Sequence, residues 1–218
     1  MLRFITSGES HGHCLVGILE GLPSGLEVDT EYVNLQLYRR QQGYGRGERM
    51  QIENDRIEIT SGVRHGRTLG SPICFLIENR DWPNWRIAMS PEAVPVKSDI
   101  RSVTCARPGH ADLAGALKYQ TYDARDILER ASARETAVRV AGGALCQLLL
   151  HRFGIRIGSH VMAVGTIRVP DEYQQLESEE ILKIDIRSPL RCAEPETERQ
   201  MMALIDQAKK AGDTLGGI

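Results

Sequence analysis

Hydrophobic residues follow two different periods along this chain, and the changes between them outline its elements. Alternating or continuous apolar runs, bounded by glycine, proline and other turn residues, predict strands at residues 2–7, 14–22, 56–61, 72–78 and 155–169. Apolar residues spaced three and four apart predict helices at residues 29–43, 111–119, 132–153 and 196–210. Because helices and strands are interleaved, the pattern predicts an α/β or α+β class with an antiparallel hairpin at the start.

The helix predicted at residues 132–153 has the clearest pattern in the chain. One apolar stripe runs along it, made of Ala137, Ala141, Ala144, Leu148 and Leu149. Ser132 and Glu135 have the spacing of a capping box, so we expect Ser132 to open the helix. The unpaired N–H groups of a helix start favour anions, and Arg130 and Arg134 flank this start with no sequence neighbour that neutralises both. The stretch therefore predicts a site for a strongly anionic ligand.

Two irregular segments complete the outline. Residues 81–99 hold three prolines and two tryptophans and predict a long surface loop. Residues 212–218 are typical of a turn that enters a new strand, so we expect the chain to be truncated at its C-terminus. The length of 218 residues allows one large domain or two small ones.

Composition excludes several function classes. The formal net charge is −2, which disfavours a general attraction to nucleic acid or to anionic membranes. The charge is uneven, however, because residues 39–49 hold four arginines and one glutamate, whereas residues 171–198 hold nine acids and three bases. The five cysteines never form Cys-x-x-Cys, which argues against a disulfide framework and for a reducing compartment. With no visible signal peptide and no apolar run of membrane-spanning length, we expect a soluble, cytoplasmic protein.

His11 lies between glycines in the stretch GESHGHC, where the backbone can approach a ligand closely. An imidazole titrates near neutral pH, which suits proton delivery to a leaving group. His13 makes a His-x-His metal pair conceivable, but no third ligand is evident, so we expect no metal. A plain turn histidine is the alternative interpretation of His11, and the residues alone favour it.

Four arginines bracket the glycine-rich loop at residues 43–47, namely Arg39, Arg40, Arg46 and Arg49. Guanidinium groups match carboxylate and phosphate, and the glycines let the loop fold over a ligand. The alternative is a solvated helix end, where cations also complement the helix dipole. Tyr44 is the only aromatic residue in the segment, which disfavours a nucleic-acid patch.

His110 lies in the stretch RPGHAD, before the helix predicted at residues 111–119. Asp112 is a candidate cap for that helix, and Gly109 permits a sharp turn that presents His110. A capped loop without a ligand explains these residues equally well. The chain lacks the P-loop, Rossmann, nucleophile-elbow and HExxH patterns, so none of those sites is supported.

Five motifs in this order and spacing resemble the amino-terminal part of the chorismate synthase family. They are GESHG, RRQQGYGRGERM, SGVRHGRTLGSPI, RPGHADLAGALKY and ERASARETAVRVAGGA. The similarity runs from about residue 4 to the closing GDTLGGI. It implies an α+β fold, a β-α-β sandwich that is incomplete at the C-terminus, with residues 1–218 forming a single truncated domain. It also implies a homotetramer when the chain is full length.

The resemblance implies a lyase of the shikimate pathway. Members of the family convert 5-enolpyruvylshikimate 3-phosphate to chorismate and phosphate by an anti-1,4 elimination, the last common step of aromatic amino-acid biosynthesis. They need reduced FMN, and some members reduce that flavin with NADPH. His11 is then the acid that assists phosphate departure, and His110 governs protonation near the flavin. The implied substrate-anion residues are Arg40, Arg46, Arg49, Arg107 and Arg134. The implied cofactor residues are Arg40 and Arg46 for NADP and Arg130, Ala131 and Ser132 for the flavin.

Three alternatives stay open at this point. They are a fragment that keeps only the substrate-anion site or an assembly role, an NADPH-dependent flavin reductase, and an anion-binding protein without catalysis. Because the rest of the family's chain supplies further flavin contacts, we expect the isolated 218-residue chain to bind FMN weakly and to turn over poorly. A transient flavin signal on adding the phosphorylated substrate would distinguish the lyase from the reductase.

Overall fold

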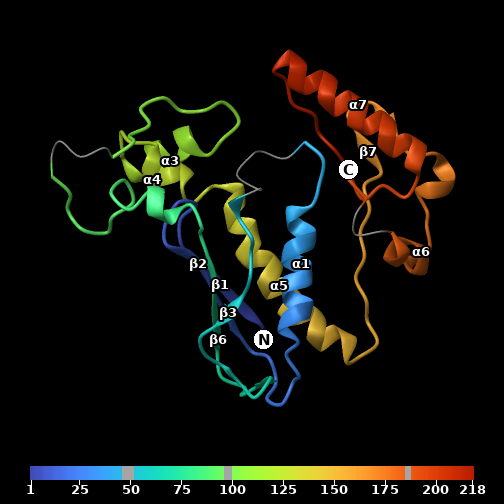
Figure 1. Cartoon of the computed structure of the whole chain (residues 1–218), viewed down its shortest axis with the longest axis horizontal. Helices are drawn as coiled ribbons and strands as arrows, with labels where there is room; N and C mark the ends of the chain where they lie inside the picture. The colour runs from blue at the N-terminus through green and yellow to red at the C-terminus, as the bar shows by residue number, and fades with distance from the viewer. Residues whose placement is uncertain (46–51, 96–99, 185–187) are drawn as a thin grey trace. The chain divides into compact units, whose positions relative to one another are not determined.

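A computed structural model describes residues 1–45, 52–95, 100–184 and 188–218 of the chain (Figure 1). The chain divides into two compact units. Unit 1 comprises Met1–Leu37 and Gln51–Leu149, and unit 2 comprises Tyr38–Met50 and Leu150–Ile218. The single domain expected over the whole chain stays a prediction.

Unit 1 is built on a four-stranded antiparallel sheet with the strand order β1-β2-β6-β3 (Figure 1). Its strands are β1 (Arg3–Ser7), β2 (Cys14–Glu20), β3 (Glu58–Ile59) and β6 (Ile73–Glu78). The register pairs Ile5 with Ile18, and Ile18 with Cys74. The four strands predicted in this part of the chain are therefore confirmed, with shorter bounds, and the first two form the expected hairpin.

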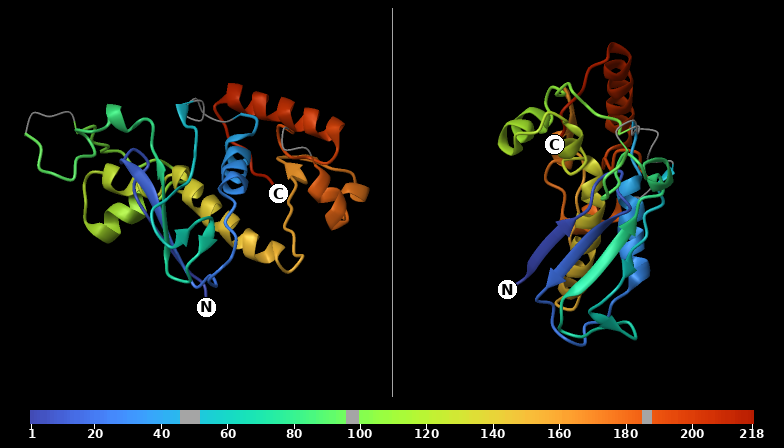
Figure 2. Two further views of the ribbon diagram at one scale, coloured as in Figure 1. Left: turned by 60° about the horizontal axis from the view of Figure 1, so that its bottom comes forward. Right: turned by 90° about the vertical axis from the view of Figure 1, so that its left-hand side faces the viewer.

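One face of the sheet forms the core of unit 1 together with helices α1 (Thr30–Gln41) and α5 (Thr136–His151). Both helices lie against the same face of the sheet (Figure 2). Strand alternation turns five buried side chains toward them, namely Leu15, Leu19, Ile73, Phe75 and Ile77. At Gly17, a Cβ would come within 2.4 Å of Phe75 and 2.9 Å of Val138, so the missing side chain lets α5 approach the sheet closely.

Mixed helices and strands confirm the α+β class. The described residues of unit 1 supply one sheet layer and one helix layer of the expected β-α-β sandwich. The remaining elements of unit 1 are β4 (Val63–Arg64), β5 (Arg67–Thr68), η1 (Trp82–Asn84), α3 (Asp112–Tyr119), α4 (Arg125–Leu128) and η2 (Ala133–Glu135). The helix predicted at residues 111–119 is thus confirmed, and the described part of the predicted 81–99 loop contains a single 3-10 turn.

Unit 2 is built around the long helix α7. Its elements are β7 (Ala163–Val164), β8 (Ile167–Arg168), η3 (Asp171–Tyr173), α6 (Ser178–Lys183) and α7 (Pro195–Ala211). Glu194 caps α7 by accepting the N–H groups of Glu196 and Thr197, and Gly212 ends it with a left-handed φ of 69°. The buried cluster of Val169, Cys192 and Met201 forms the core of this unit. The helix predicted at residues 196–210 is confirmed.

The strand predicted at residues 155–169 forms only in its second half, as the β7–β8 hairpin. The segment before it is irregular, and Ile155 and Ile157 are 48% and 55% exposed. An alternating pattern is stabilised as a strand only where one face is buried, and here the alternate isoleucines stay in solvent. The prediction for residues 155–162 is therefore wrong.

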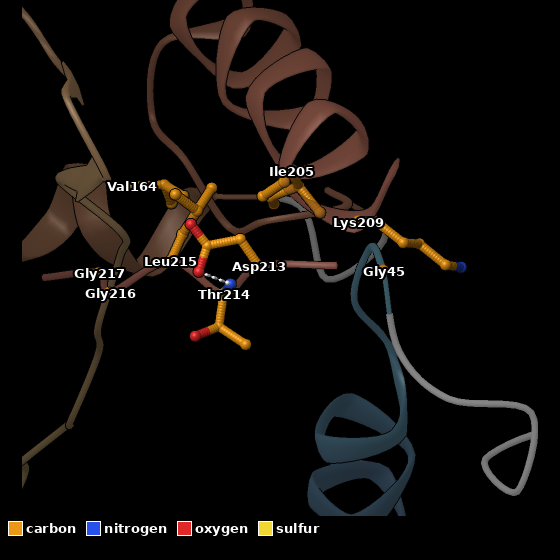
Figure 3. Close-up of a pocket in the computed structure, with 10 residues that line it drawn as sticks. Gly45, Val164, Ile205, Lys209, Asp213, Thr214, Leu215, Gly216 and Gly217 are labelled. Carbon is orange, nitrogen blue, oxygen red and sulfur yellow. Dashed lines mark hydrogen bonds between the residues drawn. The ribbon is translucent and has the colours of Figure 1, made fainter. Parts of the chain in front are cut away.

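The segment after α7 turns back along β7, as the turn-and-strand pattern predicts. Gly165 N–H donates to the Gly216 carbonyl at 2.9 Å, and Ile218 N–H donates to the Ala163 carbonyl at 2.9 Å. A hollow of about 390 Å³ lies between this segment and α7, where Ile205 and the stem of Lys209 line it (Figure 3).

Candidate active site

The turn between β1 and β2 holds His11 against Glu129, which lies 118 positions further along the chain. The Glu129 carboxylate accepts hydrogen bonds from the His11 backbone N–H and from the ring Nδ1, both at 2.8 Å. The Glu129 carbonyl accepts the Ser10 N–H at 2.9 Å. The Glu129 side chain is 1% exposed and that of His11 is 18% exposed. The imidazole thus lies at the edge of unit 1, with its carboxylate partner inside.

Glu129 is held as a carboxylate. Burial raises its pKa, but hydrogen bonds from His11 and Arg125 together outweigh burial, so the pKa of Glu129 lies below its ordinary value. Arg125 Nη1 donates to the same carboxylate at 2.8 Å. Because an ionised carboxylate only accepts hydrogen bonds, Nδ1 of His11 carries a proton. Nε2 is therefore the ring atom at which His11 would exchange a proton with a ligand.

An aromatic ring and two cations complete this cluster. Trp85 stacks on the His11 imidazole with the ring centroids 3.8 Å apart, and its indole N–H donates to Asp81 at 2.7 Å. The guanidinium carbons of Arg101 and Arg125 lie 4.1 Å and 5.0 Å from the centroid of the Trp85 ring. Trp85 thus contacts both the His11 imidazole and two guanidinium groups, and Arg125 also binds the Glu129 carboxylate.

Arg107, His110 and Asp112 form a second group at the start of α3. Buried Asp112 accepts the Arg107 Nε–H at 2.9 Å and the Arg107 backbone N–H at 3.1 Å, and it contacts His110 Nδ1. The hydrogen bond from Arg107 is the main cause that holds the pKa of Asp112 well below its usual range. The Arg107 side chain is 50% exposed, so part of its guanidinium group faces solvent.

Asp112 does not cap α3, so that expectation is wrong. Ala111 is the N-cap and Asp112 is the first helical residue. Its carboxylate turns back to the preceding loop, where the charges of Arg107 and the imidazole of His110 outcompete the helix N–H groups. The aspartate therefore fixes the two side chains that the sequence marks as functional.

The two groups act on each other through Glu129. The pKa of Arg107 is raised, chiefly by its hydrogen bond to Asp112 and to a smaller extent by the charges of Asp112 and Glu129. His11, Arg107 and His110 all lie in unit 1, and the charge of the carboxylate that binds His11 also acts on Arg107.

Ser132 precedes α5 as predicted. Its hydroxyl accepts the Arg134 N–H at 3.2 Å, and a 3-10 turn separates it from the α-helix proper. Glu135 directs its carboxylate to the Thr6 hydroxyl and to Arg139 Nε, both at 2.7 Å. In the described part of the chain, the reciprocal half of the capping box is therefore replaced by contacts to β1 and to the next turn.

Arg134 is neutralised, contrary to the expectation from its sequence neighbours. Its side chain is 4% exposed, and Nη1 lies 2.5 Å from Asp55. Its Nη2 lies 3.5 Å from Glu53 and 3.1 Å from the Glu78 carbonyl, and its Nε donates to Asn79 at 2.9 Å. The expectation fails because both acids lie far away in the sequence and are brought to Arg134 only by folding.

Arg130 and Ala131 line a cavity of about 640 Å³ in unit 1. Arg130 donates to the Thr6 hydroxyl and carbonyl and lies 3.6 Å from Glu135, so it too has an acidic partner. Its side chain nevertheless stays 41% exposed. Lys118 adds a second cation to the same cavity.

The other predicted residues are not placed in this site. Arg40 lies in the last turn of α1, within unit 2, and Arg46 and Arg49 lie outside the described residues. Their substrate and NADP roles stay predictions. Among the described residues, no three His, Cys, Asp or Glu side chains gather as metal ligands. In the same residues, no helix is both long enough and apolar enough to cross a membrane.

The sequence analysis missed five neighbours of the predicted residues, namely Glu53, Asp55, Asn79, Trp85 and Glu129. Asn79 closes the turn that carries His11 by donating to the carbonyls of Glu9 and Gly12. Glu129 offers a partial clue, because its (i, i+4) spacing from Arg125 predicts a helical ion pair.

A family model described as chorismate synthase matches residues 2–218. The chain belongs to the chorismate synthase family. The chorismate synthase of Geobacillus thermodenitrificans (strain NG80-2) is 52% identical over 219 residues, which is 100% of this chain and 56% of that protein. The chorismate synthase of Solibacter usitatus (strain Ellin6076) is 51% identical over 220 residues, with the same coverage.

A solved structure titled "Crystal Structure of Chorismate Synthase" has a TM-score of 0.76 to this chain and 41% sequence identity. It covers 99% of this chain, which in turn covers 56% of that structure. The resemblance drawn from the five motifs is therefore confirmed at the level of the family and of the α+β fold. The chain spans 56% of the length of the curated chorismate synthases that it matches.

Proposed function

We propose that this chain carries the phosphate-elimination part of a chorismate synthase. In that reaction 5-enolpyruvylshikimate 3-phosphate loses phosphate and a ring proton by anti-1,4 elimination and becomes chorismate. The C–O bond to phosphate breaks with its electron pair on the leaving oxygen, so a proton donor at that oxygen lowers the barrier. The proposal depends most on one observation, the His11 imidazole held by buried Glu129.

His11 is the proposed acid. Glu129 binds Nδ1 and orients the ring, and Nε2 is the proposed atom that delivers a proton to the phosphate. The stacked indole of Trp85 fixes the plane of the imidazole. A histidine in a plain turn needs neither a buried carboxylate nor a stacked ring, so this setting favours the catalytic interpretation.

Arg107 is the proposed anion ligand that the geometry supports best. Asp112 fixes its Nε edge, and the side chain still keeps half of its surface exposed for a phosphate or carboxylate. His110, on the same aspartate, is placed to hold or move a proton beside it. For Arg134 we propose a supporting role, because its guanidinium group already binds Asp55, Glu53 and two further acceptors. Arg40, Arg46 and Arg49 remain proposed ligands on the family resemblance alone.

Reduced FMN is the proposed cofactor. The cavity at Arg130 and Ala131 is the candidate place for such a group, because it offers about 640 Å³, the cations of Arg130 and Lys118 beside the carboxylate of Asp126, and apolar walls from Ala114 and Ile127. Ser132 follows directly and would keep its position as the cap of α5. When bound, reduced flavin would lend electron density to the substrate and recover it with the ring proton. The residues described here would hold its phosphate and one wall of its ring.

We further propose a cytoplasmic homotetramer for the complete protein, with NADPH as a reductant of its flavin. Support for assembly comes from exposed apolar side chains on and beside α3, where Leu113, Leu117 and Tyr122 are 61%, 72% and 99% exposed. Support for NADPH comes from the family resemblance of Arg40 and Arg46 only.

Calorimetric titration of the 218-residue chain with the substrate tests this function. We expect 5-enolpyruvylshikimate 3-phosphate to bind about tenfold or more tightly than shikimate, because charge-assisted hydrogen bonds to phosphate are lost with shikimate. Arg107→Gln should remove most of that difference. Arg3→Gln is the matched control, because Arg3 is exposed and its acid partner Glu20 lies 3.9 Å away at the surface. Equal affinity for the two ligands would overturn the proposal.

A further inference from the structure

A second group of cationic side chains surrounds a cavity in unit 2. The cavity has a volume of about 320 Å³ and is lined by the C-terminal end of α1, by residues 159–161 and by residues 188–191. Arg39, His160 and Arg191 contribute to its wall. Within the described part of the chain, no acidic side chain lines it. The described lining is therefore polar and includes two guanidinium groups and one imidazole.

Two of these side chains contain a buried nitrogen atom without a hydrogen-bond partner. They are Nδ1 of His160 and Nε of Arg191, and the described residues contain no other buried side-chain polar atom in this condition. Such a nitrogen loses its bonds to water without replacement, so native proteins rarely leave it alone. Both residues line the same cavity, so an acceptor bound there is the nearest candidate to supply the missing bonds.

The surrounding backbone fixes Arg191 in place. Its φ is 57°, a left-handed conformation that is unfavourable for arginine. Its Nη2 donates to the Ser159 carbonyl at 3.1 Å, and its own carbonyl accepts the Val161 N–H at 3.0 Å. These bonds tie residues 159–161 to residues 188–191, the two segments that carry the unpartnered nitrogens.

Among the described residues, no acidic side chain is paired with Arg191. Burial lowers the pKa of Arg191, and the positive charge of Arg39 lowers it further. Glu198 approaches the same loop, but its carboxylate accepts the Ser188 hydroxyl and the N–H groups of Leu190 and Cys192. The negative charge of an anion in the cavity would raise the pKa of Arg191 and so oppose both effects.

We propose that this cavity binds a small oxyanion of the phosphate class. Arg191 Nε and His160 Nδ1 would donate to its oxygens, and Arg39 would add positive charge to the wall. Phosphate offers acceptors in several directions, which suits donors on two separate segments, and its tetrahedral group fits a cavity at the small end of ligand sites. The site extends beyond the proposed elimination, because Arg39, His160 and Arg191 have no role in that reaction here.

Nuclear magnetic resonance of the ¹⁵N-labelled 218-residue chain tests the proposal. The chain is titrated with inorganic phosphate, with malonate and with sodium chloride at matched ionic strength. We expect the Arg191 Nε–H and His160 ring resonances to shift saturably with phosphate, more weakly with malonate, and not with chloride. In Arg191→Gln, the His160 ring should report about ten- to hundredfold weaker phosphate binding, which is the loss expected for a charge-assisted hydrogen bond.

Matched variants separate this site from the rest of the chain. Arg156→Gln should bind phosphate as the wild type does, because Arg156 is 56% exposed and does not line the cavity. His11→Gln should also leave the Arg191 response unchanged, so failure of the proposed catalytic site would not affect this result. If Arg191→Gln does not fold, as judged by circular dichroism, His160→Gln decides the matter through the Arg191 resonance. An equal response to chloride, a preference for malonate, or unaltered phosphate binding in the folded variants would overturn the proposal.

Discussion

Replacement of Arg134 by methionine should remove a large part of the stability of the chain. The guanidinium group lies between Asp55 and Glu53, and the three side chains are 4%, 0% and 1% exposed. Loss of one partner from a buried ion pair costs about 3–5 kcal/mol, because the charges that stay buried lose the compensation which that partner gave. The free energy of unfolding of a whole domain is about 5–15 kcal/mol, so the Arg134→Met variant should be close to unfolding at room temperature.

Urea unfolding followed by circular dichroism measures this loss, with a constant m-value as the check that both proteins unfold alike. Arg139→Met is the matched control on the same helix, where Arg139 is 61% exposed and bonds Glu135 at 2.7 Å. An exposed pair at this (i, i+4) spacing is worth about 0.3–0.5 kcal/mol. The difference between the two variants should therefore be about 3 kcal/mol or more.

A double-mutant cycle identifies the source of the effect. Asp55→Asn combined with Arg134→Met removes both charges of the closest pair, so the double variant should be more stable than the sum of the single losses by about 1 kcal/mol or more. The reasoning is refuted if Arg134→Met loses no more stability than Arg139→Met. If it instead lost substrate affinity with unchanged stability, Arg134 would be an anion ligand, as the sequence pattern predicts.

Two further changes have outcomes that follow from the same structure. Gly142 and Gly143 are neighbours in α5: a Cβ at Gly142 would lie 2.7 Å from the Phe4 ring, whereas a Cβ at Gly143 meets nothing within 4 Å. Gly143→Ala should therefore stabilise the chain by about 0.5–1 kcal/mol, whereas Gly142→Ala should not stabilise it. In urea unfolding, the free energies of the two variants should differ by about 1 kcal/mol or more. Equal free energies of unfolding would contradict the packing of α5 against Phe4. Glu129 has a lowered pKa in the folded state, so its contribution to stability is present above the unfolded value of 4.5 and is lost as the pH falls through the folded value. Glu129→Gln should therefore reduce the loss of stability at acid pH, whereas the same change at exposed Glu20 should not reduce it. An unchanged loss of stability at acid pH in Glu129→Gln would show that Glu129 does not have a lowered pKa.

Local patterns were sufficient to predict the core elements. The strands β2 and β6 and the helix α5 are confirmed. Their apolar residues follow the period of a strand or of a helix over a few neighbouring residues, and these same residues are the ones that become buried. The strands β4 and β5 were not predicted, because two residues are too few to show a hydrophobic period. The strand prediction is wrong at residues 155–162 because a sequence pattern does not show whether another element covers the apolar face.

The chemistry of the site depends on partners that no local pattern connects. Glu129 is 118 positions from His11, and Asp55 is 79 positions from Arg134. The sequence therefore identifies the imidazole and the guanidinium groups but not the carboxylates that hold them. This is why Arg134 was predicted to be open to a ligand and is found to be neutralised.

We propose that His11, held by Glu129, donates a proton to the departing phosphate. The most direct test of this proton transfer is turnover by a chimaera in which residues 1–218 replace the matching part of the Geobacillus thermodenitrificans chorismate synthase, assayed anaerobically with reduced FMN. His11→Gln should lower kcat by about 10²–10⁴-fold with little change in KM, whereas the adjacent variant His13→Gln should keep most of the activity. A His11→Gln chimaera that folds, binds FMN and turns over at the parental rate would contradict the account.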